Sequence, residues 1–182
     1  MITFVTGNKN KIRELSSVLG DVFTAVDIDL PEIQSLSFED VIGAKLKEAR
    51  KSIQDGDIMV EDSGYVFHGL GTLPGPFSKF FLESLGLTGI YDLVSSLSSN
   101  KATFYSHIGY MDKTGIATFF DGATPGTIVT PEGEGGFGFD PLFIPDGYTK
   151  RFAEMTEEER QTVKPRILAA KKLKEYLKNK ES

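Results

Sequence analysis

The sequence contains no cysteine among its 182 residues. Neither a disulfide framework nor a thiolate zinc site can therefore form. No apolar stretch approaches the ~20 residues that span a bilayer, and no basic segment precedes the first apolar run. These absences predict a cytoplasmic protein without a membrane partner. The only two histidines, His68 and His107, lack the carboxylate spacing of a metal motif and are interpreted as structural.

The chain also has fewer basic than acidic residues: 20 Lys and Arg against 26 Asp and Glu give a net charge of −6. This balance argues against broad nucleic-acid binding. The charge is uneven, because residues 150–182 carry ten basic against six acidic side chains. A basic terminal segment on an acidic body is either a solvated helix face or a source of cations for a small polyanion.

Length and periodicity predict one α/β domain over residues 1–182. At 40% hydrophobic and 25% charged residues, the chain has the profile of a globular protein with a single core. The order strand, helix, strand, helix, strand, then helices, a hairpin and a final helix favours a mixed sheet. The expected strands are 2–5, 22–28, 57–67, a hairpin over 102–120, 126–129 and 141–144. A first helix is expected to end at Gly20 and a second to begin after Ser37. Two short helices are expected near 77–85 and 88–97, and a helical tail over 156–180 with a break at Pro165.

The first strand is followed by a turn that carries a glycine, two amides and two lysines. A helix N-terminus offers unpaired N–H groups and a partial positive charge, which suits an anion. The turn matches neither a Walker loop nor a dinucleotide fingerprint, so an ordinary structural turn remains the alternative. Its residues are Thr6, Gly7, Asn8, Lys9, Asn10 and Lys11.

Two adjacent carboxylates, Glu61 and Asp62, end the apolar run of the third strand. Acidic side chains at the carboxyl end of such a strand lie where α/β sheets bind ligands. Neighbouring strand residues point to opposite faces, so the two need not act together. Glu32, in the loop after the second strand, is a candidate second ligand for Mg²⁺. A turn acid bound to a backbone N–H is the structural alternative.

The segment 133–141 places glycines around Phe137, Phe139 and Asp140. Both rings are expected to be exposed, because the segment has little other apolar content. An exposed phenyl ring can stack on a base, and Asp140 can accept hydrogen bonds from a purine or a sugar. For either ring taken singly, burial in the core is the alternative.

Arg160, Lys164 and Arg166 cluster around a helix break at Pro165. Their donors could converge on one spot, or they could simply line a solvated helix face.

Taken together, these segments resemble the inosine triphosphate pyrophosphatase family. The resemblance runs through essentially the whole chain and rests on "FVTGNKNKIREL", "DLPEIQ", "VEDSGYVFHGLGTLPGPFSKFFLESLG", "GFGFDPLFIPDGY" and "FAEMTEEER" in this order. It implies a central long mixed sheet flanked by helices, with two lobes and an active-site cleft between them. It also implies a homodimer that needs Mg²⁺ and hydrolyses ITP, dITP and XTP. Water would attack the α-phosphorus, giving the nucleoside monophosphate and pyrophosphate.

The resemblance also implies roles for individual residues at the phosphate end of the substrate. The turn Thr6–Lys11 would hold the triphosphate, and Lys45 and Lys79 would add cations. Glu32 and Asp62 would bind the metal. Asp62 would activate water, with Ser63 assisting beside it.

At the base end, the resemblance implies that Phe137 stacks on the purine and that Asp140 binds the base and sugar region. Gly138 and Phe139 of the same motif, and Arg160, where the family usually has lysine, are expected in the substrate site. The sequence departs from the family at Lys164-Pro165-Arg166, where Ser-His-Arg is usual. Arg166 matches, and Lys164 would substitute as a donor for the lost histidine, because Pro165 has no N–H.

This departure puts base discrimination in question and leaves two alternatives open. One is a pyrophosphatase for other modified nucleoside triphosphates. The other is a non-catalytic nucleotide-binding module, against which the intact carboxylates Glu32 and Asp62 argue.

Overall fold

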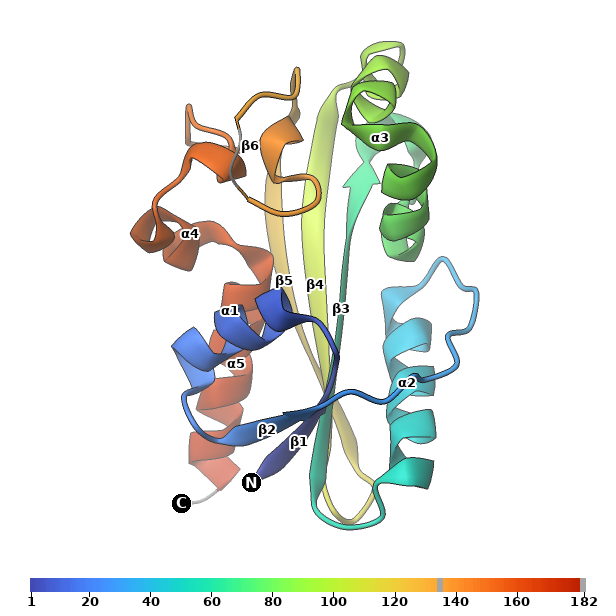
Figure 1. Cartoon of the computed structure of the whole chain (residues 1–182), viewed down its shortest axis with the longest axis vertical. Helices are drawn as coiled ribbons and strands as arrows, with labels where there is room; N and C mark the ends of the chain where they lie inside the picture. The colour runs from blue at the N-terminus through green and yellow to red at the C-terminus, as the bar shows by residue number, and fades with distance from the viewer. Residues whose placement is uncertain (134–135, 181–182) are drawn as a thin grey trace. The chain divides into compact units, whose positions relative to one another are not determined.

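The computed structural model describes residues 1–133 and 136–180 and contains a six-stranded mixed sheet flanked by helices (Figure 1). The order across the sheet is β2-β1-β3-β4-β5-β6, and β1 pairs in parallel with both β2 and β3. The strands are β1 (Ile2–Val5), β2 (Phe23–Val26), β3 (Asp57–Phe67), β4 (Lys101–Met111), β5 (Ala117–Ile128) and β6 (Phe143–Pro145). The helices are α1 (Lys9–Leu19), α2 (Phe38–Ser52), α3 (Ser78–Ser95), α4 (Glu157–Val163) and α5 (Pro165–Lys180). Within these described residues, no helix is long and apolar enough to cross a membrane.

The chain divides into two compact units, which are described separately below. Unit 1 comprises Met1–Asp62, Ser106–Gly122 and the described residues from Arg166 onward. Unit 2 comprises Ser63–Tyr105 and Ala123–Pro165. The expectations of a single functional domain and of a cleft between two lobes stay predictions.

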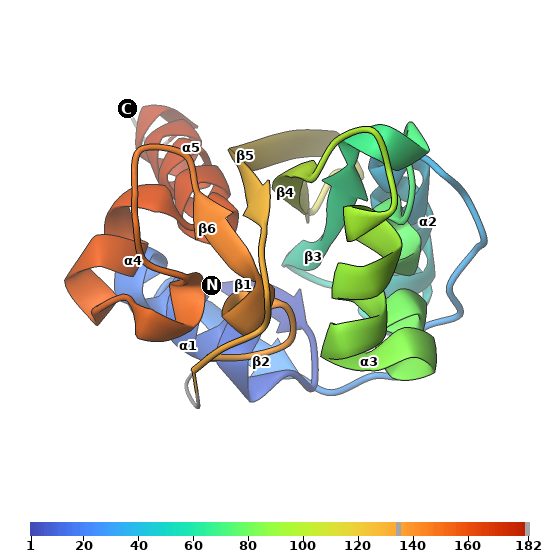
Figure 2. The ribbon, with the colours of Figure 1, turned by 90° about the horizontal axis from the view of Figure 1, so that it is seen from above.

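Unit 1 has a hydrophobic core on each face of its strands. Helices α1 and α5 lie on one face and α2 on the other (Figures 1 and 2). The alternation of β3 explains this arrangement, since Met59 packs with α1 and α5 whereas Ile58 and Val60 pack with α2. The strand is therefore apolar on both faces, which is why its sequence is a continuous hydrophobic run.

Unit 2 is organised around aromatic side chains. Tyr65 of β3 stacks on Phe104 at 4.3 Å and on Phe139 at 4.6 Å between ring centroids. Ile90 and Val94 of α3 pack into the same cluster. The two short helices expected near 77–85 and 88–97 are the two halves of α3, separated by non-helical backbone at Gly86.

Local capping signals are confirmed. Ser37 accepts a hydrogen bond from the Asp40 amide at the start of α2, and Thr156 and Glu159 form the capping box of α4. Pro165 begins α5, as expected for a proline in a first turn. The strand expected over 141–144 is partly wrong: residues 140–142 form a 3₁₀ turn and β6 begins at Phe143, because Pro141 lacks an N–H and its fixed φ suits a turn.

Candidate active site

The turn between β1 and α1 is organised by two of its own side chains. The Asn8 amide oxygen accepts hydrogen bonds from the Asn10 and Lys11 backbone N–H groups, at 2.9 and 3.2 Å. Thr6 Oγ1 accepts from the Asn8 N–H at 3.1 Å. These side chains therefore cap α1 and satisfy N–H groups that the sequence suggested for an anion. Lys9 is exposed.

Gly7 has a packing reason of its own. A Cβ atom at this position would lie 2.5 Å from an Asp27 carboxylate oxygen, far inside normal contact. The glycine thus admits the close approach of Asp27 to the turn, independently of any ligand.

The alternation of β3 directs its two adjacent carboxylates, Glu61 and Asp62, to opposite faces. Glu61 follows the parity of Met59 and lies on the face of α1 and α5, whereas Asp62 follows Val60 toward the face of α2. The expectation that these adjacent acids need not act together is consistent with their separate contacts, described next.

On the α2 face, the ammonium of one lysine contacts both of the expected metal ligands. Lys45 Nζ lies 2.7 Å from a Glu32 carboxylate oxygen and 3.7 Å from an Asp62 oxygen. The Lys45 side chain is only 11% exposed and that of Asp62 18%, whereas Glu32 is open to solvent. Burial raises the pKa of Asp62, and the nearby lysine cations oppose this rise. Burial opposes the charge of Lys45, but Asp62 and Glu32 outweigh it and raise the pKa of the ammonium.

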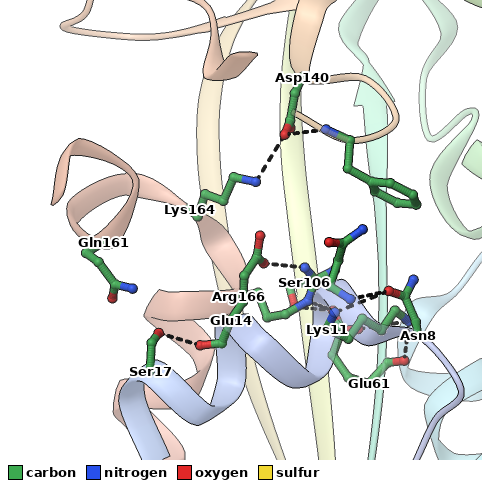
Figure 3. Close-up of polar contacts among 12 residues, drawn as sticks. Asn8, Lys11, Glu14, Ser17, Glu61, Ser106, Asp140, Gln161, Lys164 and Arg166 are labelled. Carbon is green, nitrogen blue, oxygen red and sulfur yellow. Dashed lines mark hydrogen bonds and ion pairs between the residues drawn. The ribbon is translucent and has the colours of Figure 1, made fainter. Parts of the chain in front are cut away.

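On the α1 and α5 face, Glu61 lies in a buried charge cluster (Figure 3). One carboxylate oxygen accepts from Ser106 Oγ at 2.6 Å and from Arg166 Nε at 3.0 Å. The other oxygen forms an ion pair with Lys11 Nζ at 2.9 Å. Arg166 also donates through Nη1 to Glu14. Burial disfavours the charge of Glu61, but Arg166, Lys11 and the serine outweigh it and lower its pKa to about 2.

In unit 2, the glycine-rich loop holds one ring outward and one inward. Phe137 is 62% exposed, whereas Phe139 is buried and stacks on Tyr65. The expectation that both rings are exposed is therefore wrong for Phe139, whose neighbours in the core are supplied by β3. Asp140 accepts from the Phe137 N–H at 2.9 Å and from Lys164 Nζ at 3.2 Å (Figure 3).

Other expected site residues of unit 2 have different surroundings. Lys79 is 80% exposed and pairs with Glu83 on the same helix. Arg160 donates from Nε to the Phe152 carbonyl oxygen at 3.1 Å and so braces the turn before α4. Gly138 adopts a φ of +63°, which suits glycine. Ser63 is half-buried on β3.

The three cations around the helix break are described by their own contacts. Lys164 contacts Asp140, Arg166 contacts Glu14 and Glu61, and Arg160 contacts backbone carbonyls. The hypothesis that their donors converge on one spot stays a prediction.

Sequence reasoning missed Glu14 and Ser106 as members of the buried cluster. A signal for Glu14 was present, because it lies four residues before the buried Val18 and beside the buried Leu15. A charge at a core-facing position of an amphipathic helix needs a buried partner. No comparable signal marks Ser106 within its strand.

The mixed sheet, the acids of β3 just past its pairing with β1 and the lysines at the start of α1 define an α/β protein of the class that binds anionic ligands beside the carboxyl ends of its strands. The chain belongs to the Ham1 family, whose model matches residues 2–176. Inosine triphosphate pyrophosphatase of Schizosaccharomyces pombe is 39% identical over 184 residues, which cover 100% of this chain and 97% of the relative. Inosine triphosphate pyrophosphatase of Emericella nidulans is 37% identical, covering 97% of this chain and 96% of that one.

Solved structures agree with the fold. The Ham1 protein of Staphylococcus aureus has a TM-score of 0.83 at 21% identity, covering 99% of this chain and 100% of that one. A HAM1 protein of Coxiella burnetii has a TM-score of 0.84 at 22% identity, covering 98% of each chain. A nucleoside-triphosphatase, dITP/XTP pyrophosphatase, of Mycobacterium abscessus is 28% identical with a TM-score of 0.72, covering 89% of this chain and 93% of that one.

Proposed function

We infer that the chain is a pyrophosphohydrolase that converts ITP, dITP and XTP to the nucleoside monophosphate and pyrophosphate. The observation that carries this conclusion is the likeness to two inosine triphosphate pyrophosphatases, which extends over essentially the whole chain. The 28% identical structure named as a dITP/XTP pyrophosphatase supports the same substrate class. Such an activity would cleanse the nucleotide pool of deaminated purines. A homodimer and a cytoplasmic location belong to the same proposal.

Glu32 and Asp62 are proposed to hold Mg²⁺. Both carboxylates approach the same Lys45 ammonium, so hard oxygen ligands of net negative charge meet at one point. One or two carboxylates, completed by substrate phosphates and water, are what Mg²⁺ usually takes from a protein. The bound ion would neutralise phosphate charge as it develops in the reaction.

Asp62 is proposed to accept the proton of the attacking water. Its side chain is 18% exposed against 60% for Glu32, so it is the more enclosed of the two carboxylates and is better held to receive a proton. Lys45 keeps the carboxylate in place and supplies a positive charge beside it. Because phosphoryl chemistry depends mainly on positioning and charge neutralisation, these two roles suffice for this part of the site.

The turn 6–11 is proposed to bind the triphosphate chiefly through its lysines. The N–H groups of Asn10 and Lys11 already donate to Asn8, so the turn contributes less through its backbone than the sequence suggested. Lys9 is exposed and available to a phosphate. The placement of Lys11 is developed below.

The loop of unit 2 is proposed to recognise the base. Phe137 presents an exposed ring for stacking, and the adjacent Asp140 is fixed by Lys164. Deamination converts the 6-amino donor of adenine into a 6-oxo acceptor, so a site that offers donors accepts inosine and rejects adenosine. A buried donor left unpaired by the wrong base can discriminate by ~10⁴ or more.

A panel of ITP, XTP, GTP, ATP and modified pyrimidine triphosphates tests the proposal. Pyrophosphate release should be fastest from ITP and XTP and should require Mg²⁺. Orthophosphate as the first product would refute the reaction. Faster turnover of a modified pyrimidine than of ITP would favour the second candidate, a pyrophosphatase for other altered nucleotides, to which Lys164-Pro165 points. Binding without any turnover would identify a nucleotide-binding module instead.

A further inference from the structure

Glu61 is enclosed in unit 1 with 0% of its side chain exposed, and a cation lies against each of its carboxylate oxygens. Ser106 Oγ and Arg166 Nε donate to one oxygen, and Lys11 Nζ lies 2.9 Å from the other. The Glu61 backbone carbonyl also accepts a hydrogen bond from Lys11 Nζ, at 2.9 Å. One residue of β3 thus holds the lysine of α1 at two points.

This double contact limits what Lys11 can do. A lysine ammonium has three N–H bonds, and one of them donates to the Glu61 backbone carbonyl oxygen, whereas the contact with the Glu61 carboxylate is an ion pair at 2.9 Å. Among the contacts of the described residues, at least one N–H therefore remains for a ligand. The Lys11 side chain is 18% exposed, so that donor is not sealed in the core.

The charges of the cluster balance. Glu14 and Glu61 supply two negative charges, and Lys11 and Arg166 supply two positive ones. Burying such groups is costly, and well-packed apolar residues often give equal or greater stability. Stability alone therefore does not account for a buried carboxylate at this point.

We propose that Glu61 is a positioning residue, which fixes the ammonium of Lys11 for a substrate phosphate and does not bind the metal itself. A free lysine side chain samples many rotamers, and holding it before binding removes most of that ordering cost from the binding step. Because Lys11 is held in this way before binding, loss of Glu61 should affect KM for the triphosphate more than kcat. This inference rests on the proposed function.

A double-mutant cycle tests it. Glu61→Gln, Lys11→Met and the double variant are compared by steady-state pyrophosphate release from ITP. Glu61→Gln should raise KM about tenfold and change kcat less than threefold. In the Lys11→Met background, Glu61→Gln should change KM less than twofold, because the group through which it acts is gone. If Glu61→Gln raised KM by the same factor in the wild-type and in the Lys11→Met background, the proposal would be overturned.

Glu14→Gln is the matched control. It is the same substitution at a buried acid of the same cluster, and it removes a partner of Arg166 while the contacts of Lys11 stay. Thermal unfolding should show that Glu14→Gln destabilises the protein, while KM for ITP should change less than threefold. A rise in KM equal to that of Glu61→Gln would assign the effect to general loosening and overturn the proposal.

Ser106→Ala keeps the proposal testable if Glu61→Gln does not fold. It removes the 2.6 Å hydrogen bond that steadies Glu61 and leaves all charges in place. KM for ITP should rise about threefold, and the rise should vanish in the Lys11→Met background. A rise that persists there would overturn the proposal.

Binding of inorganic triphosphate separates this inference from the proposed function. Calorimetry without Mg²⁺ measures the cation contribution and does not depend on turnover. Glu61→Gln should weaken binding about tenfold, and only when Lys11 is present. One outcome is that the wild-type protein fails to hydrolyse ITP while the effect of Glu61→Gln on triphosphate binding still depends on Lys11. The proposed function would then fail and the positioning role would stand. Absence of the coupling in an enzyme active on ITP would refute the positioning role alone.

Discussion

Replacing Lys164 by methionine should destabilise the protein strongly. The side chains of Lys164 and Asp140 are 9% and 5% exposed, so solvent screens their ion pair very little. Methionine keeps the length of the lysine stem, and its sulfur can still contact the Phe152 ring that the ammonium covers at 5.5 Å. The substitution therefore isolates the loss of charge.

The expected magnitude follows from the stranded carboxylate. Removing one partner of a buried pair costs about 3–5 kcal/mol. The lower end applies, about 3 kcal/mol, because Asp140 keeps the hydrogen bond from the Phe137 N–H. With a urea dependence of about 2 kcal/mol/M, the unfolding midpoint should fall by about 1.5 M.

Urea denaturation followed by circular dichroism measures this change. The double variant Lys164→Met/Asp140→Asn removes both charges and should recover at least half of the loss. A loss below about 0.5 kcal/mol for Lys164→Met would mean that the pair behaves like an exposed one, and the reasoning would fail. Failure of the double variant to recover would also refute it.

Three further predictions concern single residues. Phe137→Ala should raise KM for ITP by roughly 5- to 150-fold, since base stacking contributes about 1–3 kcal/mol; an equal effect on inorganic triphosphate would argue against stacking. Burial and the Asp57 carboxylate raise the pKa of Tyr110 to about 12, so the folded state keeps a proton that the unfolded state loses above about pH 10. Stability should therefore fall from about pH 10 to 12, and Tyr110→Phe should remove this part of the fall; alkaline spectrophotometric titration should find a tyrosine that ionises only near pH 12. Gly7→Ala should lower stability by less than about 1 kcal/mol in a thermal unfolding assay, because the three atoms nearest to its Cβ, at 2.5–2.7 Å, all belong to the exposed Asp27 side chain, which can rotate away. Gly43→Ala, inside α2, brings its new Cβ within 4 Å of nothing beyond its chain neighbours and its own helix backbone, so it should instead raise stability by about 0.5–1 kcal/mol in the same thermal assay.

Local features of the fold were predictable because their causes are local. The caps at Ser37 and Thr156 depend on residues three positions away, and the end of α1 at Gly20 depends on one glycine. The βαβαβ order followed from apolar runs and helical spacing. The start of β6 was missed because a proline turn interrupts an apolar run, and the run alone does not show it.

The candidate site was predictable in its residue types but not in its pairings. Glu14 and Arg166 lie 152 positions apart in the sequence, and no periodicity relates them. Likewise, the sequence pattern over 133–141 contains two phenylalanines, and it does not indicate which of them is buried in the core. Phe139 is buried because Tyr65 of a distant strand provides a stacking partner. Tertiary packing made these choices.

The measurement closest to the central claim is the fate of oxygen during hydrolysis of ITP in oxygen-18-enriched water. Attack of water on the α-phosphorus places the label in the nucleoside monophosphate and leaves pyrophosphate unlabelled. With wild-type protein and Mg²⁺ the account predicts this pattern, and Asp62→Asn should abolish it while the circular dichroism spectrum stays native. Label in the released pyrophosphate, or full activity of Asp62→Asn, would contradict the account.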